Sequence, residues 1–172
     1  MSTGWRGRVT AVAVALLLSA CASYSGSGLV PGTSTAADVQ ALMGAPSLRL
    51  PHPGGGSVWF YSRLPEGRDT YKVTIGPHGV MRSIEQVLTK ANVAKIVPNT
   101  TTMAQVRALL GPPGEVSWLT LKPRIVWEYK MRDVAEPRIL WVQFSADDIV
   151  REVIEMHDFS ADAPGSADAC RP

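Results

Sequence analysis

The sequence predicts an α+β protein of two tandem units, each with one or two short helices packed on a three-stranded antiparallel sheet. The first observation is a repeat, because residues 29–46 (LVPGTSTAADVQALMGAP) and 96–113 (IVPNTTTMAQVRALLGPP) match along their length. Self-similarity of this kind indicates a duplicated supersecondary unit. The second observation is that three stretches rich in aromatic and β-branched residues follow each copy, as is typical of strands. We expect the units to span residues 29–88 and 89–159.

The repeated stretch predicts one short helix in each unit. In the first copy Thr35 and Asp38 have the spacing of a capping box, and Gly44 ends the helix. The second copy repeats these signals at Thr102 and Gly111. Apolar residues between them recur at i, i+3 and i+4, which gives one apolar face. A helix of two to three turns is not stable alone in water, so this face must pack on a sheet.

The sheets are predicted from alternating polar and apolar residues. We expect strands at 57–63, 70–75 and 80–88 in the first unit, then a short helix at 89–96 and strands at 124–131, 139–144 and 149–156 in the second. The period of two places Trp59 and Tyr61 on one face, and Trp127 and Tyr129 take the same places in the second unit. We expect these four aromatic side chains in the cores. Arg82 interrupts the apolar face of its strand, and we expect it near the sheet margin.

The N-terminal segment indicates export and lipid attachment. Residues 1–20 carry two arginines, no acidic residue and an apolar run from Val9 to Leu18, as in a secretory signal peptide. The run is too short to span a membrane as a helix. It ends in Leu-Ser-Ala-Cys, which is similar to the bacterial lipobox, whose cysteine receives acyl chains such as palmitate and becomes the N-terminus. We therefore expect lipidation at Cys21; the alternative is an ordinary signal peptide with an incidental cysteine.

The residue after that cysteine predicts which membrane holds the protein, and the two ends of the mature chain predict a tether and a tail. Ala22 stands where an Asp would favour inner-membrane retention, so the lipobox resemblance implies the outer membrane, with the protein facing the periplasm. Residues 21–28 are small and predict a flexible tether. Residues 160–172 predict a disordered tail, in which Cys170 is either an incidental thiol or the site of an intermolecular disulfide.

Several of these features resemble the SmpA/OmlA family, the lipoproteins called BamE in the outer-membrane β-barrel assembly machine. The features are the helix that ends in Gly44-x-Pro46, the strand with Trp59-Phe60-Tyr61, and the strand–turn–strand at 71–84, present here as two tandem repeats. The resemblance implies two short helices on a three-stranded antiparallel sheet. It also implies that Phe60 and Arg63 belong to a surface that faces a partner protein or lipid. The tandem copies are similar as well to the β-lactamase-inhibitor-like architecture, in which paired modules form a concave, protein-binding sheet.

The alignment of the two units predicts a further apolar patch. Trp141 aligns with Lys72, on the face opposite the helix, and Val126 accompanies it there. An apolar patch on the outer face of a sheet marks an interface. The alternative is that these residues join the two repeats.

Composition and spacing argue against other classes of function. The chain has 17 Lys and Arg against 15 Asp and Glu, and loss of the signal peptide with its two arginines leaves 15 of each sign. Such a chain lacks the basic footprint of nucleic-acid binding. His52, His78 and His157 lack metal-ligand spacing, and Gly54-Gly55-Gly56 opens a strand, not the helix of a phosphate site. We therefore expect no metal, no cofactor and no small-molecule substrate.

The sequence thus predicts a non-enzymatic outer-membrane lipoprotein that binds envelope proteins. The family resemblance gives the β-barrel assembly machine as the candidate partner, in support of barrel assembly or envelope integrity. Cys21 is the expected anchor, and Phe60, Arg63 and Trp141 are the expected partner- or lipid-facing surface. The alternative is a periplasmic protein inhibitor or binding module that uses the concave sheet of the tandem repeats.

Overall fold

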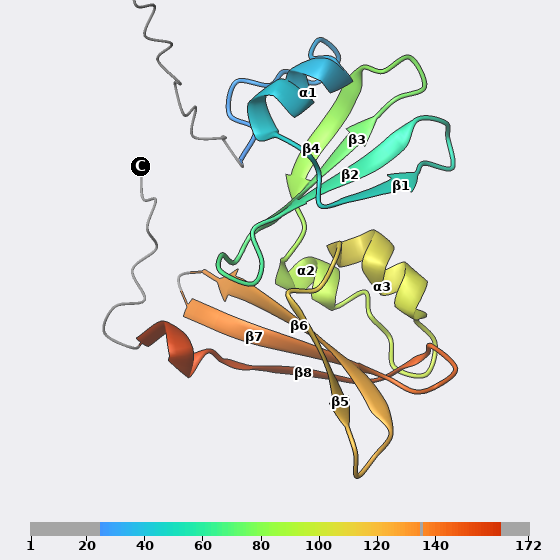
Figure 1. The fold of residues 1–172 in the computed structure, drawn as a ribbon, viewed down its shortest axis with the longest axis vertical. Coiled ribbons are helices and arrows are strands. Elements are labelled where there is room, and N and C mark those ends of the chain that lie inside the picture. Colours follow the sequence, from blue (N-terminus) through green and yellow to red (C-terminus); the bar gives the residue numbers. More distant parts are fainter. Residues whose placement is uncertain (1–24, 135, 163–172) are drawn as a thin grey trace, which may run out of the picture.

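A computed structural model describes residues 25–134 and 136–162 of the chain (Figure 1). The predicted signal peptide, Cys21, most of the predicted tail and Cys170 lie outside these residues. The helices are α1 (Ala36–Met43), α2 (Lys90–Val93), α3 (Met103–Leu110) and the 3-10 helix η1 (Phe159–Asp162). The first four strands are β1 (Leu48–Pro51), β2 (Ser57–Ser62), β3 (Thr70–Ile75) and β4 (Met81–Gln86). The others are β5 (Glu115–Leu119), β6 (Arg124–Asp133), β7 (Glu136–Phe144) and β8 (Val150–His157).

The strands form two antiparallel sheets in the orders β1-β2-β3-β4 and β5-β6-β7-β8. The prediction of an α+β protein with antiparallel sheets is confirmed, but the predicted number of three strands in each sheet is wrong. In both units an additional edge strand, β1 or β5, follows the helix and pairs with the first predicted strand. An edge strand has a partner on one side only, so it needs fewer buried residues, and the sequence marks it weakly.

The helix boundaries follow the predicted capping signals. The Thr35 side chain accepts from the Asp38 backbone N–H, and the Asp38 carboxylate accepts from the Thr35 backbone N–H. Thr102 and Gln105 make the same reciprocal pair at the start of α3. Both main helices end at a glycine with positive φ, as predicted. The short helix predicted at 89–96 is present as α2, with Thr89 as its N-cap.

A β-bulge changes the predicted face of the fourth strand. The register between β3 and β4 shifts at Thr74/Ile75, so that Met81, rather than Arg82, lies opposite Ile75. Met81 is buried and Arg82 is exposed. The extra residue of a bulge turns the following side chain to the other face, so the strict alternation used for the prediction fails at this point.

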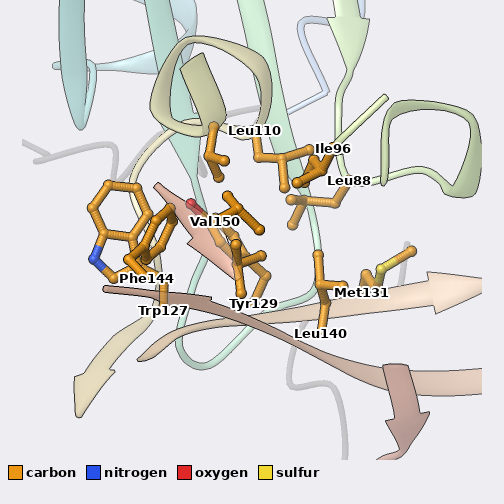
Figure 2. Packing of buried hydrophobic residues seen from close by; sticks show 11 residues of the cluster. Leu88, Ile96, Leu110, Trp127, Tyr129, Met131, Leu140, Phe144 and Val150 are labelled. Atoms are coloured by element: carbon orange, nitrogen blue, oxygen red, sulfur yellow. The ribbon is translucent and has the colours of Figure 1, made fainter. Parts of the chain in front are cut away.

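Each unit has its own apolar core between its helices and one face of its sheet. In the first unit Val39 and Met43 of α1 pack against Trp59, Tyr61 and Val73. In the second, apolar residues of α3 and of the segment around α2 pack on the sheet, as Figure 2 shows. The labelled members are Leu88, Ile96, Leu110, Trp127, Tyr129, Met131, Leu140, Phe144 and Val150. The four aromatic residues predicted for the cores, Trp59, Tyr61, Trp127 and Tyr129, are all buried there.

The two units dock through the outer face of the first sheet. The helices α2 and α3 lie between the two sheets, so that the order of layers is α1, first sheet, α2 and α3, second sheet (Figure 1). Phe60 and Thr70 of the first sheet are fully buried, and Gly111 after α3 lies close to both. Leu64 also packs against the core of the second unit. The first sheet therefore has helices on both faces.

The start of the described chain belongs to the first unit. Gly26 is buried, and a Cβ built there would lie 2.3 Å from Ile84 Cδ1 and 3.4 Å from Met43 Sδ. Its carbonyl accepts a hydrogen bond from the Leu29 N–H at 3.0 Å. The packed region therefore begins at least three residues before the predicted boundary at 29, which shortens the predicted tether of 21–28. None of the helices in the described ranges is long and apolar enough to cross a membrane.

Candidate binding surface

Phe60 does not lie on a free surface, which corrects its expected role as a partner- or lipid-facing residue. Its side chain is 0% exposed on the outer face of the first sheet. A Cβ built on Gly111 would lie only 2.8 Å from Phe60 Cδ1, so the ring is pressed against the chain that leaves α3. The second unit covers this position, so Phe60 belongs to the contact that joins the two repeats.

Arg63 is exposed and follows β2 in a loop that belongs partly to the contact between units. Its backbone N–H donates to the Asp69 carbonyl at 3.0 Å, and its carbonyl accepts from Gly67 N–H at 2.7 Å. In the same loop Leu64 packs on the core of the second unit. The loop is thus held at both ends, and Arg63 stands at its exposed side. Its contact with a partner remains a prediction.

Trp141 lies on the outer face of the second sheet, as its alignment predicted. In the register of the sheet it stands between Glu128 of β6 and Ile154 of β8. Its indole N–H donates to Glu128 Oε2 at 2.9 Å, which holds both side chains against the sheet. Val126 on the same face is 3% exposed. Both residues thus lie on the face that the alignment of the units predicted.

We call this surface the β6–β8 outer face and define it by its alternating residues on the three strands. These are Val126, Glu128, Lys130, Ile139, Trp141, Gln143, Glu152, Ile154 and Met156. The helices α2 and α3 lie on the opposite side of this sheet, and no described helix covers the outer face (Figure 1). Unlike the corresponding face of the first sheet, it is partly accessible to solvent: Glu152 is exposed, six of the nine residues are half-buried, and Val126 and Gln143 are buried.

The chemistry of the β6–β8 outer face suits a protein partner. Its centre combines an indole with aliphatic side chains and its periphery carries both acidic and basic groups, Glu152 and Lys130 among them. Protein interfaces commonly have an apolar, aromatic centre and a polar rim. Hydroxyl, thiol and imidazole groups, which serve as nucleophiles and bases in hydrolases, do not occur among the nine residues that define the face. Carboxylates and an amine are present in Glu128, Glu152 and Lys130, and the arrangement as a whole can bind a protein partner.

Three of the described titratable groups with shifted pKa values, Tyr61, Tyr129 and Asp158, lie in the cores and the unit contact. Burial raises the pKa of Tyr61 to about 12, against the opposing charge of Arg49, and burial also raises the pKa of Tyr129. Burial would raise the pKa of Asp158, but hydrogen bonds from Ser160 and Arg68 outweigh it and lower the value. These shifts follow from packing within and between the units. None of them lies on the β6–β8 outer face.

The histidines remain apart in the fold. His52 Nδ1 accepts from Gly54 N–H at 3.1 Å within the β1–β2 loop, His78 is exposed in a turn, and the His157 ring packs edge-on against Phe159 at 4.8 Å. Within residues 25–134 and 136–162, no group of three or more His, Cys, Asp or Glu side chains could hold a metal ion. The three glycines after His52 belong to a strand-to-strand loop.

An exposed hairpin was missed by the sequence predictions. Strands β5 and β6 and their connection project away from the rest of the second unit (Figure 1). Trp118 is 69% exposed and Leu121 is 99% exposed, although both are large apolar residues. Trp118 precedes the first strand predicted in the second unit, at 124–131, and no strand was predicted there. The alternation of Val116 and Trp118 is the signal that could have identified a strand here.

Comparisons with known proteins do not place the chain in a family. No family model matches the sequence, and no curated protein matches it. Among solved structures, the chain is similar to YjgB, a DUF4309 family protein from Bacillus subtilis subsp. subtilis str. 168, with 20% sequence identity and a TM-score of 0.31. The match covers 77% of this chain and 84% of that protein.

Proposed function

We propose that this protein is a non-enzymatic lipoprotein of the outer membrane that faces the periplasm and binds envelope proteins. The observation that carries the proposal is the β6–β8 outer face, which no described helix covers and where Trp141 stands between Glu128 and Ile154. The same face of the first sheet is buried by the second unit, so only one of the two sheets offers this surface. Attachment through Cys21 would hold the surface close to the membrane.

The β-barrel assembly machine is the candidate partner complex, on the strength of the resemblance to SmpA/OmlA proteins in the capped helix and the Trp59-Phe60-Tyr61 strand. The alternative is a periplasmic protein inhibitor or binding module that uses the concave sheet of the tandem repeats. The two sheets are separate, and α2 and α3 lie between them. A shared concave sheet is therefore absent from the described residues, and we favour binding through the second sheet alone.

Affinity capture from intact envelopes tests the proposal. We expect the wild-type chain to recover outer-membrane assembly components, and Trp141→Ala to reduce that recovery about tenfold while its unfolding transition stays cooperative. Val97→Ala serves as the control, because Val97 is 51% exposed and lies outside the β6–β8 outer face. Equal recovery by Trp141→Ala and wild type would remove Trp141 from the binding surface. Recovery of a soluble periplasmic hydrolase alone would favour the inhibitor function.

The anchor is tested in the same preparation. Replacing Cys21 by Ser should move the protein from the membrane fraction to the soluble periplasmic fraction. A Cys21→Ser variant that stays with the membrane would show that the lipid anchor is not at this residue. The two outcomes are independent, because capture reports the surface and fractionation reports the attachment.

A further inference from the structure

The free edges of the two sheets differ in how they are protected. Natural sheets guard their edges with proline, charged side chains or covering segments, because an open edge can pair with another strand. Strand β1 contains Arg49 and Pro51. Covering segments protect the start of β4, where Gly32 N–H donates to Met81 O, and the start of β8, where Asn99 N–H donates to Val150 O.

Strand β5 has neither proline nor a covering segment, and its one charged residue, Glu115, stands at its end. Its sequence, Glu-Val-Ser-Trp-Leu, contains neither proline nor lysine, and all five of its residues are exposed. The hairpin that carries it projects from the molecule, so no described element lies along its outer edge (Figure 1). Large apolar side chains accompany this edge, with Val116 51%, Trp118 69% and Leu119 39% exposed. An exposed apolar edge of this kind is a site for pairing with a further strand.

The sequence of β5 fits a second copy of itself. If two β5 strands pair antiparallel about a twofold axis at Ser117, Val116 of each chain lies opposite Trp118 of the other. Both side chains are on the same face, because Val116 pairs with Trp127 and Trp118 with Ile125 in the existing sheet. Aromatic and β-branched residues directly opposite each other stabilise antiparallel strands. The twofold symmetry makes the favourable pair occur twice.

The charges on the other face of β5 agree with the same register. Glu115 of one chain would lie opposite Leu119 of the other, and Leu119 already pairs with Arg124 in its own hairpin. The Arg124 side chain would therefore extend past Leu119 toward the Glu115 carboxylate of the other chain. No acidic residue lies between Glu115 and Glu128, so nothing within this hairpin competes for the arginine along that stretch. Opposite charges on neighbouring strands favour pairing, whereas a register that brought the two glutamates together would be disfavoured.

We infer that β5 is a homodimerisation edge, at which two copies of this chain join their second sheets into one eight-stranded antiparallel sheet centred on Ser117. The edge is only five residues long. Stable dimers bury at least roughly 1,200 Å² in total. Because this edge is so short, we expect a weak association that depends on protein concentration. It does not require the proposed lipid anchor or an envelope partner.

The first unit supplies an internal comparison. Its equivalent strand, β1, pairs with β2 in the same way, but it has Arg49 where β5 has Val116, and Pro51 where β5 has Trp118. Arg49 covers the Trp59 ring at 4.3 Å. The edge of the first sheet is therefore guarded at the two positions where the second sheet is apolar.

Disulfide trapping of full-length protein purified in detergent tests the register. In a Cys170→Ser background, Ser117→Cys places two thiols on the proposed twofold axis, where Cα atoms of paired residues lie about 4.5–5.5 Å apart and can form a disulfide. We expect Ser117→Cys to form a covalent dimer under mild oxidation. Leu119→Cys alone should not, because its twofold mate lies four residues out of register. The pair Glu115→Cys with Leu119→Cys should again form a covalent dimer.

Sedimentation equilibrium measures the association into dimers without introducing new thiols. We expect wild-type protein to show a concentration-dependent dimer, and Trp118→Ser to weaken the association about tenfold while leaving the unfolding midpoint nearly unchanged. Equal trapping at Ser117 and Leu119, or a monomer at every concentration, would overturn the proposal. An adduct of Ser117→Cys with a different protein in intact envelopes, or binding of monomers to phosphatidylglycerol vesicles, would overturn it and assign the edge to that occupant.

Discussion

Equivalent core residues of the two repeats make different hydrogen bonds and ring contacts. Tyr129 and Tyr61 occupy matching core positions, yet Tyr129 donates from its hydroxyl to the Gly111 carbonyl at 3.2 Å, whereas the buried Tyr61 hydroxyl has no partner. The Trp59 ring lies under Arg49, and its counterpart Trp127 packs edge-on against Phe144 at 4.9 Å. The duplication thus preserved the apolar positions while polar contacts diverged.

The two tyrosines give a matched pair of substitutions. Tyr129→Phe removes a buried hydrogen bond, and we expect it to lower the free energy of unfolding by about 1 kcal/mol. Tyr61→Phe removes a buried hydroxyl without a partner, so it should leave the free energy of unfolding unchanged or raise it slightly. Urea denaturation of both variants at neutral pH measures the difference. Equal losses would mean that the Tyr61 hydroxyl is hydrogen-bonded in solution.

The raised pKa values of these tyrosines predict that the free energy of unfolding falls in alkali. Burial raises the pKa of Tyr61 from 10.0 to about 12, so the folded protein holds this proton more tightly than the unfolded chain does. The resulting stabilisation is complete below pH 10 and is lost as the pH rises through 12. The decline in unfolding free energy between pH 10 and pH 12 should be shallower in Tyr61→Phe. A decline of the same slope would assign it to other groups, of which Tyr129 is the first candidate, since its pKa is also raised.

At the scale of the elements, the helices were more predictable than the strands. The capping residues Thr35 and Thr102 and the terminal glycines are local signals, and they fixed the boundaries of α1 and α3. The edge strands β1 and β5 were missed, because their side chains are partly or fully exposed and their pairing depends on a neighbour far along the chain. The β-bulge before Met81 was missed for a related reason, since a bulge leaves no composition signal in the strand that contains it.

Substitutions of the helix-terminal glycines test whether the end of α3 contributes to the contact between the two units. Gly44 and Gly111 have nearly the same backbone, with φ of 80° and 84°, so alanine strains both. A Cβ at Gly44 would meet nothing within 4 Å, whereas a Cβ at Gly111 would lie 2.8 Å from Phe60 Cδ1 and 3.1 Å from Thr70 Cγ2.

We therefore expect Gly111→Ala to lower the free energy of unfolding by about 1–3 kcal/mol more than Gly44→Ala does, because only the former overpacks the contact between units. Chemical denaturation of both variants, followed by tryptophan fluorescence, measures the difference. Equal losses would indicate that the end of α3 does not press on the first sheet in solution.

At the scale of the whole molecule, the docking of the units decides which surface is free. The Arg68 guanidinium reaches from the first unit to the fully buried Asp158 carboxylate at 2.5 Å. With Phe60 and Leu64, this ion pair closes the outer face of the first sheet against the second unit. Within residues 25–134 and 136–162, no helix covers the outer face of the second sheet in this way.

Because the units cover one outer face and leave the other uncovered, the sequence could predict the candidate site only in part. The constant offset between the repeats placed Trp141 and Val126 on the outer face correctly. It could not show that Phe60 would be covered while Trp141 would not, because both residues lie on the outer face of their own sheet and only the docking of the units decides which face is covered. Arg68 and Asp158 are separated by 90 residues, and no local pattern predicts their pairing.

Site-specific photo-crosslinking in intact envelopes tests the central claim, that the β6–β8 outer face binds an envelope protein. A photoreactive side chain at Glu152 stands on that face opposite Gln143, and the same group at Ala41 stands on the exposed side of α1 as the control. We predict a discrete crosslinked product with an outer-membrane protein from position 152 and none from position 41. The absence of a product at 152, or the same products from both positions, would contradict the account.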